Sequence, residues 1–247
     1  NGNGKIDLSL NFNEKGKIKK NYKIKGNISN LKLKIVKYNI EDLNFEFEII
    51  EKKYDLKKIK FKSSNIEFES DSINIINENK NFNIEGNLKN KKNKISNNLL
   101  KTLIPKTNFD NIDFTNSNID SKSKFSFQLT NKFKIKDFSL VSDLNIDDLS
   151  LNYEIINLKK YIEDYKGTIN LKKNKLKIKY NLNNFKLSGS SELYLKQNNK
   201  NLFNYNISKK KNKLSFDTLF DLKKIGIIKD NLGYKKPSEK TALLEIK

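Results

Sequence analysis

Apolar and polar residues alternate through most of the stretch from Gly167 to Leu222, and no other feature of the sequence restricts the fold as strongly. Successive side chains of a β-strand point to opposite faces, so each strand of this kind has one apolar and one polar face. Short polar segments interrupt the stretch at Lys173-Asn174, Asn183-Asn184, Gln197 to Asn201 and Lys209 to Asn212. Connections this short join antiparallel neighbours, because a parallel connection needs a dozen residues or more. The pattern predicts five strands of an antiparallel meander with one continuous apolar face.

The apolar positions of these five strands are the candidate residues of a binding face. They are Ile169, Leu171, Leu176, Ile178, Tyr180, Leu182, Phe185, Leu187, Leu193, Leu195, Phe203, Tyr205, Ile207, Leu214 and Phe216. The residues between them are mostly Lys, Asn, Ser, Glu and Asp, which suit a solvated face. Gly26, Gly86 and Gly189 occupy apolar positions, and a glycine in a strand permits a bend or a close approach by another group.

The same alternation fills most of the remaining chain and predicts an all-β fold. Residues 1–93 form a first meander, in which the apolar positions of 22–28 and 31–35 indicate two successive strands. Residues 121–247 form a second meander. No linker rich in Pro, Gly and Ser separates the two meanders. We therefore expect one long antiparallel meander that curls into a half-open β-groove.

One segment departs from the alternation, between residues 94 and 120. The apolar residues from Ile95 to Ile104 follow helical spacing, and Pro105 ends the run, which predicts one short helix. A polar connection continues to residue 120. The interpretation we favour is that the helix lies over the open end of the sheet, rather than on a membrane surface.

The share of hydrophobic residues limits how much of the sheet can be buried. It is 36%, below the share of an ordinary globular domain, and supplies apolar material for about one face. The chain has no Met, even at position 1, and it ends within an alternating pattern at Thr241 to Lys247. We expect it to be a fragment of a longer protein. No run approaches the roughly 20 apolar residues of a membrane-spanning helix.

The residue types of the chain disfavour most enzyme chemistry. Cys and His are absent, so disulfides, thiol nucleophiles, the usual zinc sites and imidazole acid–base chemistry are excluded. No phosphate-binding glycine loop or nucleophile elbow is present. Ser188 to Ser191 resembles a nucleophile site only superficially, because the run lies inside a strand pattern. We predict no enzyme activity, no cofactor and no metal site.

The formal charge of +21 comes from 50 basic and 29 acidic residues, and every basic residue is Lys. Such a charge attracts nucleic acid or an anionic membrane surface. The lysines are nevertheless spread along the chain, and a nucleic-acid site usually recruits Arg for its bidentate fork. We interpret the lysines as the solvated face of the strands and predict no specific nucleic-acid partner.

Three interpretations of the apolar face remain open. The sheet could curl into a groove whose apolar inside carries lipid tails, or it could close around the apolar face as a core. It could also belong to a structural or adhesive β domain at a cell surface. Roughly a dozen strands at ~4.8 Å spacing would extend about 60 Å, the dimension of a conduit. The modest hydrophobic content and the many strands in series favour the groove.

Three segments resemble the repeating strand units of the AsmA-like proteins of Gram-negative envelopes, with the YhdP and TamB branch most similar. They are Phe82 to Leu88, Lys124 to Leu151, and Gly167 to Ile178. The resemblance implies a periplasmic bridge that conducts phospholipid from the inner towards the outer membrane. It also implies an inner-membrane anchor and membrane contacts in parts of the parent chain that lie outside this sequence. Eukaryotic bridge-like lipid transfer proteins share the β-groove principle, so a eukaryotic origin stays open.

Overall fold

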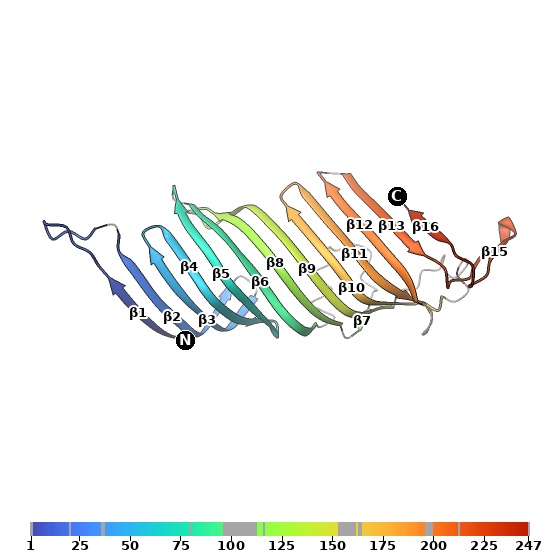
Figure 1. Cartoon of the computed structure of the whole chain (residues 1–247), viewed down its shortest axis with the longest axis horizontal. Coiled ribbons are helices and arrows are strands. Elements are labelled where there is room, and N and C mark those ends of the chain that lie inside the picture. Colours follow the sequence, from blue (N-terminus) through green and yellow to red (C-terminus); the bar gives the residue numbers. More distant parts are fainter. Residues whose placement is uncertain are drawn as a thin grey trace. The chain divides into compact units, whose positions relative to one another are not determined.

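A computed structural model shows that the chain is built almost entirely of β-strands (Figure 1). It describes residues 2–19, 21–35, 38–79, 81–95, 113–115, 117–152, 162, 165–195, 200–211 and 213–246. The predicted helix lies largely outside these residues. Its first residue, Ile95, ends a strand, and residues 96–104 are not among those described.

One large antiparallel sheet contains most of the strands in chain order, and Figure 1 shows them side by side from blue to red. The strands in this order are β1 (Asn3–Ser9), β2 (Lys23–Ile35), β3 (Tyr38–Ile50), β4 (Lys53–Ser63), β5 (Ile66–Glu78), β6 (Asn81–Ile95), β8 (Ser117–Leu129), β9 (Ile135–Asn152), β10 (Thr168–Asn181), β11 (Asn184–Tyr194), β12 (Lys200–Lys210), β13 (Lys213–Asp221) and β16 (Leu243–Ile246). Within the described chain, the end strands β1 and β16 do not pair with each other. The prediction of an all-β antiparallel meander is confirmed.

Three further strands lie outside this order. The short strand β7 (Asp113–Thr115) pairs with β9, while β14 (Ile227–Lys229) and β15 (Tyr234–Lys236) form a separate two-stranded sheet. A single 3-10 turn, η1 (Asp230–Leu232), connects β14 to β15. β7 and the first residues of β8 lie in the segment expected to be a polar connection up to residue 120. That segment therefore contributes residues to the sheet.

The contacts of the chain divide it into two compact units. Unit 1 comprises residues 1–91, 121–142 and 180–182, and unit 2 comprises residues 92–120, 143–179 and 183–247. The division differs from the expected one between a first and a second meander, because β8, β9 and β10 each contribute residues to both units.

In unit 1, the strand register brings the apolar residues to one face of the sheet. Residues paired directly across two antiparallel strands lie on the same face. One such row crosses six strands, β1 to β6, and consists of Leu8, Ile24, Ile49, Tyr54, Ile75 and Ile84. The adjacent row consists of Ile6, Gly26, Phe47, Leu56, Ile73 and Gly86. We call the surface formed by such residues the apolar face.

β-bulges allow strands of 13 or more residues to keep this face. In β2, Ser29 and Asn30 stand opposite the single residue Asn44, and Asn30 has a φ of 55°. An extra residue of this kind reverses the alternation, so that Ile28 and Leu31 share a face although they are three positions apart. The two strands expected at 22–28 and 31–35 are therefore one strand, β2.

A β-bulge also corrects the prediction of five strands between Gly167 and Leu222. Lys173 has a φ of 51° in the middle of β10, so Lys173-Asn174 is a bulge and not a connection between two strands. Four strands, β10 to β13, thus replace the five expected. Mid-strand residues with positive φ also occur in β3, β4 and β9, at Asp42, Lys58 and Asp137.

Few apolar side chains in the described part of the chain are buried. Among the described residues, the buried hydrophobic side chains are Ile59, Ile66, Ile119, Tyr165, Leu171, Leu193, Leu222 and Ile225. Most other apolar side chains of the face are half-buried. In unit 2, Leu222 and Ile225 after β13 pack on Leu171 and Leu193 and cover this part of the face.

Candidate functional site

The register of β11, β12 and β13 brings the candidate residues of these strands to one face. Leu187 is paired with Ile207, and Ile207 with Phe216. The next row towards the strand ends joins Phe185, Lys209 and Leu214. Leu193, Leu187 and Phe185 alternate on the same face of β11. The apolar face of the central stretch is therefore continuous across these three strands in the row of Leu187, Ile207 and Phe216, and Lys209 interrupts it in the next row.

A side-chain hydrogen bond connects the face to β10. The Ser191 hydroxyl donates to Asn174 Oδ1 at 2.7 Å, so both side chains lie on the same face. Leu176 and Ile178 follow Asn174 at alternate positions and share that face. The bulge at Lys173 keeps Leu171 there too, since Leu171 packs with Leu193.

The bulge residues are held by polar contacts with the neighbouring strands. The Lys173 ammonium lies 3.0 Å from a carboxylate oxygen of Glu192, and Lys58 in β4 lies 2.8 Å from Glu46. Lys200 lies 2.6 Å from the same Glu192 oxygen. Hydrogen bonds from Lys200 and Lys173 lower the pKa of Glu192 to about 2.

The exposure of the candidate residues divides them into three groups. Leu171 and Leu193 are buried, and Ile169, Leu195 and Phe203 pack against their cluster. Leu176, Ile178, Phe185, Leu187, Tyr205 and Ile207 are half-buried. Tyr180, Leu182, Leu214 and Phe216 are exposed, the last two by 70% and 41%. The second and third groups are the ones accessible to a ligand.

Two candidates belong with unit 1. Tyr180 lies near the end of β10, and its ring centroid is 5.8 Å from that of Phe138. Phe138 in turn lies 6.4 Å from Phe127. Leu182 lies just after β10, in the turn to β11. Phe127 and Phe138 were not among the candidates, although the same alternation marks them.

Two glycines of the apolar face lie beneath aromatic rings of the next strand. A Cβ added at Gly189 would come within 2.5 Å of the Tyr205 ring, and one at Gly26 would come within 2.7 Å of the Phe47 ring. The group expected to approach these glycines is thus an aromatic side chain of the sheet itself. Burial of the Tyr205 side chain raises the pKa of its hydroxyl group to about 12.

Small polar residues interrupt the apolar face, and they hydrogen-bond with one another. Ser123 and Ser142 hydroxyls lie 2.8 Å apart in unit 1, and Ser121 donates to Asn90. In unit 2, the Ser191 hydroxyl donates a hydrogen bond to Asn174. Because these groups satisfy each other, they add little polarity to the surface offered to a ligand. The sequence does not identify these residues, because the alternation rule assigns polar residues such as Ser and Asn to the solvated face.

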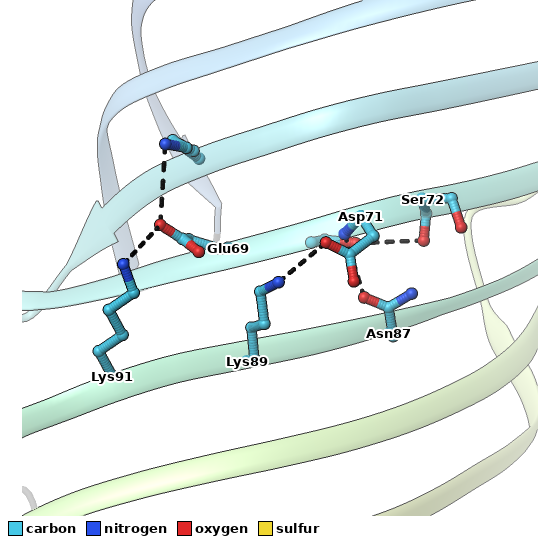
Figure 2. A network of polar contacts seen from close by, with 8 residues as sticks. Glu69, Asp71, Ser72, Asn87, Lys89 and Lys91 are labelled. Carbon is cyan, nitrogen blue, oxygen red and sulfur yellow. Dashed lines mark hydrogen bonds and ion pairs between the residues drawn. The ribbon is translucent and has the colours of Figure 1, made fainter.

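The opposite face of the sheet carries the charges (Figure 2). Glu69 of β5 lies between Lys60 of β4 and Lys91 of β6, with both N–O distances 3.8 Å. Lys89 lies 2.9 Å from Asp71, whose backbone N–H donates to Asn87 at 3.1 Å. Such exposed cross-strand pairs each contribute little to stability. They show that many lysines of this face are neutralised within the sheet.

The described residues contain no cluster of three or more acidic side chains suited to a metal ion. They also contain no helix long and apolar enough to cross a membrane. What the arrangement offers is an apolar surface of one sheet, backed by a charged surface.

Comparison of the chain with protein-family models, with curated proteins and with solved structures gives no match.

Proposed function

We propose that the apolar face binds the acyl chains of phospholipids and that the protein carries lipid between membranes. The observation that supports this most directly is the row from Leu8 to Ile84, which crosses six strands without a charged side chain and in which each side chain is half-buried or exposed. Such a face in water is unfavourable by about 25 cal/mol per Å² of apolar surface, so an apolar ligand would stabilise it.

The dimensions of the face suit an acyl chain. Six strands at ~4.8 Å spacing span about 24 Å. Half the hydrocarbon core of a bilayer, the depth occupied by one acyl chain, is about 15 Å. An extended acyl chain therefore fits on the part of the face that belongs to unit 1 alone.

The resemblance to AsmA-like proteins gives the proposal its cellular setting. In that setting the chain is a non-enzymatic part of a periplasmic bridge, anchored to the inner membrane by a segment outside this sequence. Phospholipid would move along the apolar face towards the outer membrane. The charged opposite face would remain in the aqueous periplasm.

A second function is favoured by one observation in unit 2. Leu171 and Leu193 are covered by Leu222 and Ile225, as in an ordinary hydrophobic core. If the whole face were covered in this way, the protein would be a structural or adhesive β domain without lipid. The half-buried state of Leu187 and Ile207 favours the lipid-carrying function instead.

Native mass spectrometry of the purified chain tests the proposal. We expect bound phospholipid in the unmodified chain and its loss in Ile178→Asp, because a carboxylate on the apolar face repels acyl chains. Lys179→Asp is the matched control, since it places the same group on the opposite face of the same strand. Absence of lipid from the unmodified chain, or equal loss in both variants, would contradict the proposal.

A further inference from the structure

The tip of the hairpin between β9 and β8 exposes an aromatic side chain at a strained backbone position. Phe133 is 81% exposed and has a φ of 55°. A bulky residue with positive φ is an outlier, because its Cβ crowds the backbone. Neither the backbone conformation nor the exposure of this ring favours Phe at this position.

The chain contains the same turn with the residue that the conformation favours. At the tip between β1 and β2, the Gly16 N–H donates to the Asn13 carbonyl at 2.9 Å, and Asn13 N–H donates to the Lys17 carbonyl at 2.9 Å. Gly16 there has a φ of 71°. Glycine adopts such a φ without steric cost.

The turn around Phe133 repeats these hydrogen bonds. Phe133 N–H donates to the Thr130 carbonyl at 2.9 Å, and Thr130 N–H donates to the Lys134 carbonyl at 3.0 Å. A side-chain bond is also repeated, since Lys134 N–H donates to Thr130 Oγ1 as Lys17 N–H donates to Asn13 Oδ1. Phe133 thus stands where the equivalent turn has Gly16, which makes the aromatic ring the feature that requires an explanation.

Positive charge and a second apolar side chain surround the ring. Lys132, Lys134 and Lys136 are all exposed, and Ile135 between them is 62% exposed. Among the described residues, no ion pair joins these three lysines to a carboxylate, and the nearest acid in the sequence is Asp137. An aromatic ring flanked by lysines is the combination that binds the interface of an anionic bilayer, where the ring enters the headgroup region and the ammonium groups meet lipid phosphates.

We propose that this hairpin tip, residues 131–136, docks the protein on the surface of an anionic phospholipid membrane. Phe133 and Ile135 enter the interface, and the three lysines pair with anionic headgroups. The docking surface lies at the hairpin tip, and its binding to a membrane does not depend on whether the apolar face carries lipid. It also assigns membrane contact to residues of this chain, in addition to any contact made by other parts of a longer protein.

Vesicle sedimentation with the full chain measures the docking. We expect binding to phosphatidylcholine vesicles that contain phosphatidylserine, and much weaker binding to phosphatidylcholine alone. Phe133→Gly should weaken binding at least about tenfold, the effect of losing one buried aromatic side chain. The variant should fold at least as stably as the parent, because Gly accepts the φ of this position. Its bound phospholipid should be unchanged, which separates this proposal from the lipid-carrying function.

A charge comparison provides a second variant pair. Replacing Lys132, Lys134 and Lys136 together by Gln should abolish the preference for phosphatidylserine. Replacing Lys57, Lys122 and Lys124 by Gln removes the same charge from exposed positions of unit 1 away from the tip. This control should bind vesicles nearly as the parent does. Equal loss in the two triple variants would mean that net charge alone drives binding, and would overturn the proposal.

Fluorescence reports insertion directly, because the chain has no Trp. With Phe133→Trp, vesicles containing phosphatidylserine should shift the emission to shorter wavelength. With Tyr234→Trp, at the exposed first residue of β15, they should not. The proposal fails if both probes respond alike, if Phe133→Gly binds vesicles as the parent does, or if the tip variants lose affinity for duplex DNA while vesicle binding persists.

Discussion

Replacing Ile178 and Leu193 by Asp, one at a time, should give opposite results, although both are apolar positions of the same face. Leu193 is 6% exposed beneath Leu222 and Ile225. Truncating a buried Leu costs about 2–5 kcal/mol, and an unpaired buried carboxylate adds several more. The sum is comparable to the 5–15 kcal/mol that stabilises a typical domain. Leu193→Asp should therefore unfold unit 2.

Ile178 is half-buried. Complete burial of an Ile contributes ~1.5–3 kcal/mol, and Ile178→Asp would lose about half of this. Aspartate also lowers the strand propensity by up to ~1 kcal/mol, so the total loss in the free energy of unfolding is about 2 kcal/mol. For a chain of this size, that lowers the melting temperature by roughly 4–8 °C.

Thermal unfolding followed by circular dichroism distinguishes the two variants, with Lys179→Asp as the control. Ile178→Asp should keep the β spectrum at room temperature, and Leu193→Asp should lose a large part of it. Unfolding of Ile178→Asp to the same extent would show that the face is covered in solution, and our reasoning about an open face would be wrong. A folded Leu193→Asp would show that the unit 2 cluster is not a core.

Three further predictions concern the glycines, an acid and the net charge. Gly26→Ala should lower the free energy of unfolding by about 1–3 kcal/mol, which is more than Gly189→Ala should. The new Cβ at position 26 would lie 2.4 Å from the Lys5 carbonyl oxygen, whereas the new Cβ at position 189 would meet the movable ring of Tyr205. Equal losses in thermal unfolding would contradict this reasoning. Because the folded-state pKa of Glu192 is about 2, against 4.5 ordinarily, its contribution to stability should be complete above pH 4.5 and lost as the pH falls towards 2. Glu192→Gln should flatten the stability curve in this range, and an unchanged curve would argue against the ion pairs. Duplex DNA binding should be weak and disappear near physiological salt, and tight sequence-dependent binding in a salt titration would make nucleic acid a partner.

The sequence predicts the strands and their apolar face well because alternation is a local property. It does not distinguish a bulge from a strand break, since both shift the alternation by one residue. Lys58 and Lys173 do not favour a positive φ by themselves. Their conformation is accompanied by ion pairs with Glu46 and Glu192 on neighbouring strands, which only the folded sheet brings together.

The candidate site is predicted in part for the same reason. The register confirms that Leu187, Ile207 and Phe216 share one face. The cover over Leu171 and Leu193 comes from Leu222, at the end of the alternating stretch, and from Ile225, whose segment carries no alternating pattern. Turn geometry likewise decides the position of Phe133, and a single aromatic residue among lysines gives no sign of it in the sequence.

The agreement between strand order and chain order has a consequence for how the protein is made. From β1 to β5, each strand pairs with the strands directly before and after it in the sequence. A hairpin can therefore form as soon as its second strand leaves the ribosome, without waiting for a distant segment. Until the next strand arrives, the newest one is an exposed edge, and such an edge can pair with another nascent chain. Charged residues on the outward face, such as Lys57 and Glu85, would protect the growing sheet during synthesis.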